Sequence, residues 1–193
     1  MPPSNSDNLN LKPSTLNFKL TLKAWPVIAA ATIGLCYLTQ TVAKGFGIEL
    51  PDQANIELVK RYAGWNWNFA FLCLQIIILL PAVEELIFRF LLWRLPTRTL
   101  DKRQETEDGE GRKTEDGRRI NTANVVAVVS SILFSAAHYL AQPFPDSAFL
   151  ALFFFGLAQC WLYRKTGRLW CAILNHALFN LTNLVLLFVL PEA

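Results

Sequence analysis

The residues of this chain that could do chemistry lie inside its most apolar stretches. Apart from cysteines, the ionisable side chains found there are Glu84, Glu85, Arg89, His138 and His176. Ionisable residues are costly inside a bilayer, so they usually face a protein interior or a wet cavity. We therefore expect these five side chains to share one buried polar site.

The spacing of the first three side chains separates their roles. Glu85 and Arg89 are four residues apart, so on a helix they share a face and can form an ion pair. Glu84 lies about 100° round the helix from Glu85, so Arg89 cannot serve both carboxylates equally well. A cluster of ion pairs that only holds helices together stays open as an alternative.

Two further pairs with helical spacing point to the same site. Phe134 and His138 are four residues apart, and so are His176 and Asn180. A carboxylate can accept a proton from water, a histidine can pass it on, and an amide can hydrogen-bond an oxyanion. These groups suffice for a hydrolysis without a serine or cysteine nucleophile. The residues alone equally allow a zinc ion held by Glu84, His138 and His176.

The elements that must position these residues are predicted to be transmembrane helices. Of the 193 residues 53% are hydrophobic, more than is usual in a soluble domain of this size. The apolar stretches predict an all-α, multi-pass helix bundle of about five spans, at residues 24–43, 69–93, 123–141, 148–163 and 169–190. A short amphipathic helix after Asp52 is expected to lie on the membrane surface.

The polar parts of the chain suggest the domain boundaries. We expect residues 1–23 to be a flexible cytosolic tail and residues 24–193 to be one transmembrane domain, with a motif-bearing core at 69–190. Residues 97–121 carry mixed charges, glycines and almost no apolar side chains, which predicts a disordered loop. The four cysteines fall in apolar runs, which is typical of small buried side chains.

The distribution of basic residues predicts the orientation of the bundle. With five spans, fourteen lysines and arginines fall in the tail, the long loop and the last turn, on one side of the membrane. Only Lys44, Lys60 and Arg61 fall on the other side. The positive-inside rule therefore places the N-terminus in the cytosol and the C-terminus outside. We expect a lipid bilayer and a membrane-associated protein or peptide as partners, and no nucleic acid.

Three motifs, in this order, resemble those of a known family. EELIFR at 84–89, FSAAH at 134–138 and HALFN at 176–180 look like the EExxxR, FxxxH and HxxxN motifs of the CPBP family. These intramembrane proteases include the eukaryotic CAAX prenyl endopeptidases and bacterial abortive-infection or bacteriocin-immunity relatives. The resemblance is to a bacterial-type member and covers roughly residues 69–190.

The resemblance implies a CAAX-protease-like intramembrane peptidase that cuts a peptide bond of a membrane-associated or lipidated protein. Glu84 and His138 would activate the attacking water. His176 and Asn180 would complete the site and stabilise the oxyanion.

The resemblance also implies a supporting ion pair of Glu85 and Arg89, with Phe134 beside it. A glutamate-type mechanism without a cofactor is implied, and zinc on one glutamate and the two histidines is the minority alternative.

Two other classes of function stay open. One is a non-proteolytic membrane partner or bacteriocin-immunity factor that keeps the protease fold, and the other is a proton-coupled transporter. The three intact motifs favour the protease over the first, and the lack of an obvious inverted repeat counts against the second.

The depth of His138 conflicts with the common site. At about 1.5 Å per residue it lies roughly 22 Å from the start of its span, nearer the outside than Glu84 and His176. A straight helix perpendicular to the membrane would separate His138 from the other two, so we expect tilt or a buried turn to resolve the conflict.

Overall fold

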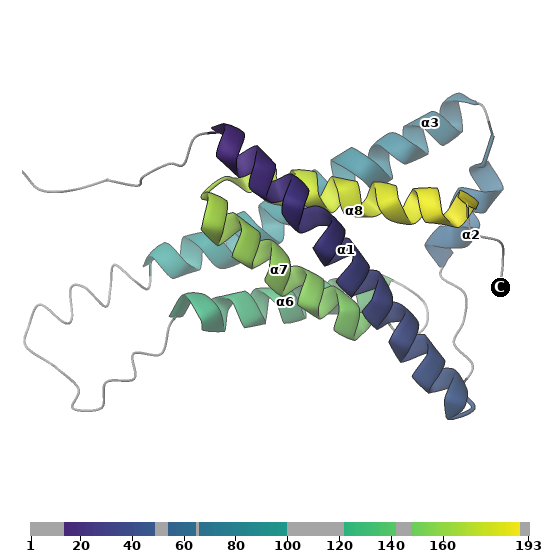
Figure 1. Cartoon of the computed structure of the whole chain (residues 1–193), viewed down its shortest axis with the longest axis horizontal. Helices are drawn as coiled ribbons and strands as arrows, with labels where there is room; N and C mark the ends of the chain where they lie inside the picture. The colour runs from purple at the N-terminus through teal and green to yellow at the C-terminus, as the bar shows by residue number, and fades with distance from the viewer. Residues whose placement is uncertain (1–13, 49–53, 65, 100–121, 142–147, 190–193) are drawn as a thin grey trace, which may run out of the picture.

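The computed structural model describes residues 14–48, 54–64, 66–99, 122–141 and 148–189, and every regular element in these ranges is a helix (Figure 1). The elements are α1 (Ser14–Gly45), α2 (Ala54–Tyr62), α6 (Thr122–Ala141), α7 (Phe149–Thr166), α8 (Leu169–Val189) and a long helix between α2 and α6. That helix consists of α3 (Trp67–Leu74), η1 (Gln75–Leu79), α4 (Leu80–Glu85) and η2 (Leu86–Arg94), followed by a last helical turn at residues 95–99. The predicted all-α bundle is confirmed.

Helix α1 begins at Ser14 rather than at residue 24, so residues 14–23 of the predicted flexible tail are helical. Two polar side chains of this extension are buried: Asn17 Nδ2 lies 3.4 Å from the Thr166 carbonyl, and Thr21 Oγ1 donates to the Asn17 carbonyl at 2.9 Å. Helix α1 crosses over α7 and α8 in Figure 1, and this packing extends the helix beyond its apolar stretch. Residues 1–13 lie outside the described ranges.

The predicted second span, at 69–93, is the middle of a helix that runs over Trp67–Thr99. Residues 97–99 of the predicted loop therefore continue this helix, and the rest of that loop, 100–121, lies outside the described residues. Two parts of the helix, η1 and η2, are π-helical, with hydrogen bonds between residues i and i+5. They flank α4, the short segment that carries the two glutamates.

Four helices among the described residues are long and apolar enough to cross a membrane: Thr15–Gly45, Trp67–Thr99, Ala123–Ala141 and Leu169–Val189. Helix α7, predicted as the short fourth span at 148–163, is not among them: its 18 residues are long enough, but its last turn carries Arg164 and Lys165, which lower its mean hydropathy. A fifth crossing by α7 therefore stays a prediction. The amphipathic helix expected after Asp52 exists as α2, and its place on the membrane surface stays a prediction too.

Aromatic side chains fill the core around the predicted site. The buried rings, each from a different segment, are Phe88, Phe134, Phe155 and Phe179. Next to Phe155 in the chain, Gly156 lets α7 approach α6 closely, because a Cβ added there would lie 2.9 Å from Ser131 Cβ. The close crossing of α6 and α7 helps to hold α6, which carries one of the histidines, against the rest of the bundle.

Candidate active site

The structure brings the predicted site residues together from three long helices. They are Glu84, Glu85 and Arg89 on the long helix, Phe134 and His138 on α6, and His176 and Asn180 on α8. We call Glu85, Arg89 and His176 the buried cluster, and Glu84 with His138 the open pair. His176 contacts both groups, through its two ring nitrogens.

Glu85 is the centre of the buried cluster. His176 Nδ1 lies 2.8 Å from Glu85 Oε1, and Arg89 Nε lies 3.2 Å from Glu85 Oε2. Glu85 and Arg89 are fully buried and His176 nearly so. The ion pair predicted from the four-residue spacing is therefore present, and a histidine from α8 extends it. Removing one member of such a cluster leaves a buried charge without its partner.

Phe134 forms a wall shared by the buried cluster and the open pair. The guanidinium Cζ of Arg89 lies 4.6 Å from the centre of the Phe134 ring, which is a cation–π contact. The same ring centre lies 4.4 Å from that of His138 and 6.0 Å from that of His176. A single buried phenylalanine therefore limits the movement of one guanidinium and both imidazoles.

Glu84 faces both imidazoles from the open side. Its Oε2 lies 3.6 Å from His176 Nε2 and 3.8 Å from His138 Nε2, both longer than a direct hydrogen bond. The side chains of Glu84 and His138 are 23% and 30% exposed, whereas that of His176 is 4% exposed. The site is therefore open at Glu84 and His138 and closed behind them.

The second nitrogen of each imidazole is held by an acceptor. His138 Nδ1 lies 3.0 Å from the carbonyl oxygen of Phe134, and His176 Nδ1 lies 2.8 Å from Glu85 Oε1. A carbonyl and a carboxylate both accept, so each Nδ1 carries the proton and donates it. In a neutral ring Nε2 is then an acceptor, and in both residues Nε2 is the nitrogen that faces Glu84.

The depth conflict at His138 is resolved by the inclination of the helices. They cross one another at an angle in Figure 1, so distance along a helix does not measure depth in the bundle. His138 Nε2 consequently comes within 3.8 Å of Glu84 Oε2.

Asn180 shares α8 with His176 but contacts a different part of the long helix. Its Nδ2 donates to the backbone carbonyl of Ile76 at 2.8 Å. An amide nitrogen carries two N–H groups, so one is left for another acceptor. The oxyanion role of Asn180 stays a prediction.

Sequence reasoning from ionisable groups missed two polar links between the helices of the site. The buried amides of Gln159 and Asn175 hydrogen-bond each other from Nε2 to Oδ1 at 3.0 Å, which ties α7 to α8 beside His176. Ser130 on α6 donates from Oγ to the Phe88 carbonyl of η2 at 2.6 Å. The sequence did carry a signal for both links, namely uncharged polar residues within apolar stretches. Such residues commonly form hydrogen bonds between helices in membranes.

The hydrogen bonds that the two histidines make through Nδ1 are relevant to the zinc alternative. A zinc-bound histidine normally donates its other N–H to a carboxylate or carbonyl, and both histidines do so here. This feature therefore does not separate the two mechanisms. Across the ranges that the structure describes, no group of three or more His, Cys, Asp or Glu side chains is arranged to hold a metal ion. The cofactor-free site stays a prediction.

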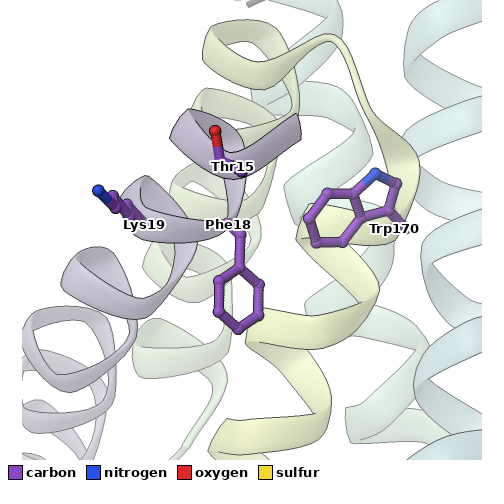
Figure 2. Close-up of a pocket in the computed structure, with 4 residues that line it drawn as sticks. All are labelled: Thr15, Phe18, Lys19 and Trp170. Carbon is purple, nitrogen blue, oxygen red and sulfur yellow. The ribbon is translucent and has the colours of Figure 1, made fainter. Parts of the chain in front are cut away.

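Two surface hollows are lined by none of the predicted site residues. One, of about 390 Å³, lies between the first turns of α1 and α8 and is lined by Thr15, Phe18, Lys19 and Trp170. Figure 2 shows the rings of Phe18 and Trp170 on either side of this space, with Lys19 pointing away from Trp170. The other, of about 300 Å³, lies between η2, α6 and α7. Neither adds a reactive group to the site.

Comparison with known proteins agrees with the resemblance seen in the motifs. A family model described as type II CAAX prenyl endopeptidase Rce1-like matches residues 66–182, a range that includes every predicted site residue. No curated protein and no solved structure matches the chain. The family and the four apolar helices together make this an integral membrane protein. The matched range is more than half of the chain, and the protein therefore belongs to the Rce1-like family of type II CAAX prenyl endopeptidases.

Proposed function

We propose that the protein is an intramembrane endopeptidase in which Glu84 activates a water molecule to hydrolyse a peptide bond of a membrane-associated or lipidated protein. The observation that supports this is the open pair: Glu84 Oε2 and His138 Nε2 lie 3.8 Å apart on the exposed side of a buried ionic cluster. Two acceptors in this position suit one water molecule, whose two hydrogens each need an acceptor.

The proposed reaction begins when the water oxygen attacks the carbonyl carbon and Glu84 takes a proton from the water. The new C–O bond moves the carbonyl π electrons onto the oxygen, and an N–H donor then has to stabilise that negative charge. Protonated on both nitrogens, His176 would donate Nε2–H, and Asn180 would add its second N–H. The C–N bond then breaks, the leaving nitrogen takes the proton from Glu84, and the products are a carboxylic acid and an amine.

The buried cluster supports this assignment of His176. His176 is held in place by its 2.8 Å contact with Glu85, so its Nε2 has a fixed direction.

The test is the cleavage of membrane peptides, lipidated and unmodified, by the purified full-length protein. We expect the wild type to cut a single bond in at least one peptide class and the isosteric Glu84→Gln variant to cut none. If the wild type and the variant gave the same products, or if neither gave any product, the result would favour a non-proteolytic partner or immunity factor.

Chelation separates the two mechanisms within the same assay. We expect cleavage to survive strong chelators, because Glu84 and His138 suffice to hold the water. Zinc bound by Glu84, His138 and His176 would instead polarise the water as a Lewis acid. Loss of activity on chelation, restored only by zinc, would overturn the cofactor-free mechanism and leave the peptidase in place.

We also propose that the N-terminus is cytosolic and the C-terminus extracytoplasmic, with α7 as a fifth crossing. The support is the excess of lysines and arginines on the predicted cytosolic side. A reporter fused after Ala193 should then lie outside, and one inserted within residues 100–121 should lie in the cytosol. Both reporters on one side would contradict the five-span topology.

A further inference from the structure

Asn180 makes a hydrogen bond that the proposed chemistry does not use. Its Nδ2 donates to the Ile76 carbonyl at 2.8 Å, which ties α8 to η1, the segment just before α4. Backbone groups inside a membrane must find partners within the protein, because no water is available in the hydrocarbon region. The Ile76 carbonyl therefore gains more from this donor than a carbonyl at an aqueous surface would.

The sequence explains why this carbonyl takes a donor from another helix. In η1 the N–H of residue i+5 donates to the carbonyl of residue i, and the last bond of this kind runs from Leu80 to Gln75. The next carbonyl in the series belongs to Ile76, and its partner would be the N–H of residue 81. That residue is Pro81, which has no N–H. The π-helical series ends here, and Asn180 supplies the donor that Pro81 lacks.

This bond lies close to the proposed site on both helices. On the long helix, Pro81 belongs to α4, the segment that carries Glu84 and Glu85. On α8, Asn180 comes about one turn after His176, whose Nδ1 contacts Glu85 at 2.8 Å. Helix α8 therefore holds the long helix at two points, one before Pro81 and one after it. Two such points oppose rotation of α4 about its axis, and that rotation decides where Glu84 points.

We infer that Asn180 is a positioning residue: by satisfying the Ile76 carbonyl that Pro81 leaves open, it holds α4 in the rotation that directs Glu84 toward His138 and His176. The inference rests on the proposed peptidase function. It is separable from oxyanion binding, because the positioning role depends on Pro81 and the oxyanion role does not.

A double-mutant cycle between residues 180 and 81 tests this inference. Asn180→Leu keeps the size of the side chain and removes the donor. We expect it to lower kcat by about 10²-fold with little change in KM, as a misplacement of about 1 Å does. In a Pro81→Ala background, residue 81 has an N–H of its own for the carbonyl. There the same change should cost at least about 10-fold less in kcat than in the wild-type background, since the two residues act on one group and only the oxyanion contact is then lost.

The matched control is Asn183→Leu, the same substitution at an exposed position of the same helix. It should leave kcat and KM unchanged in both backgrounds. Equal losses of kcat for Asn180→Leu with and without Pro81 would overturn the inference and assign Asn180 to the oxyanion alone. An unchanged kcat in the wild-type background would overturn it as well.

The same double-mutant cycle can be measured without a substrate, with the thermal midpoint of unfolding as the measured quantity. We expect Asn180→Leu to lower the midpoint when Pro81 is present and to change it little in the Pro81→Ala background. If the changes in midpoint caused by the two substitutions were additive, residues 180 and 81 would not be coupled, and the inference would fail. Because this measurement needs no cleavage, a wild type that cuts no peptide would defeat the proposed function while the role of Asn180 is still decided.

Discussion

Glu84 and Glu85 are neighbours in the chain, yet they have different surroundings. Glu85 is fully buried between His176 Nδ1 at 2.8 Å and Arg89 Nε at 3.2 Å. Glu84 is 23% exposed, and its Oε2 lies 3.6 and 3.8 Å from the two imidazole Nε2 atoms. A turn of about 100° round one helix therefore separates a carboxylate fixed by close partners from one with room for a substrate.

This comparison shows how a structural ion pair and a reactive carboxylate can share one helical turn. His176 is the link, since its Nδ1 contacts the buried glutamate and its Nε2 faces the open one. The buried glutamate thereby orients a histidine for its neighbour. Changing each glutamate in turn should consequently affect different properties of the protein.

The largest effect is expected at the open glutamate. Glu84→Gln should lower turnover by about 10³-fold or more, because it removes the proposed proton acceptor, a group that typically contributes 10²- to 10⁴-fold. The fold should be retained, since the new side chain has the same shape. Turnover and thermal unfolding of the purified variant provide the check, and a variant with near-normal turnover would remove the proposed base.

The second effect is expected at the buried glutamate and concerns stability. Glu85→Ala should destabilise the protein by about 3–5 kcal/mol, because it leaves Arg89 buried without its carboxylate. Denaturant or thermal unfolding in detergent measures the change, with Glu84→Gln as the matched comparison. If both variants unfolded at the same midpoint, the assignment of a structural role to Glu85 would fail.

The smallest effect is expected at Phe134, which contacts both groups. Phe134→Leu keeps an apolar side chain but loses the ring over Arg89, so we expect a loss of about 1–2 kcal/mol. A modest fall in turnover should accompany it, because the ring also packs against His138. Phe154→Leu, at a ring 51% exposed, is the control and should change neither property.

Much of the site could be predicted because its local contacts follow helical spacing. The four-residue separation of Glu85 and Arg89 predicted their ion pair, and the separation of Phe134 and His138 placed their rings together. The order of three motifs on three apolar stretches then indicated one common site.

Contacts between distant parts of the chain could not be derived in this way. The bond from His176 to Glu85 joins residues 91 positions apart, and the bond from Asn180 to Ile76 joins residues 104 positions apart. Both depend on how the helices cross, which the pattern of apolar residues does not specify. The π-helical turns were missed for a related reason, since the same residues suit bonds to i+4 and to i+5. The early start of α1 depends on burial of Asn17 against α7, which is a tertiary contact.

The π-helical segment η1 makes the long helix tolerant of a change in chain length. Deleting one residue from an ordinary helix rotates everything on one side of the deletion by about 100°. A deletion within residues 77–79, after the carbonyl that Asn180 binds, would return this wide turn to α-helical spacing, so the segments on either side would keep their orientation. The two glutamates would keep their contact with α8. Aligned members of the family are therefore expected to show a one-residue gap here more readily than at any position between Glu84 and Arg89.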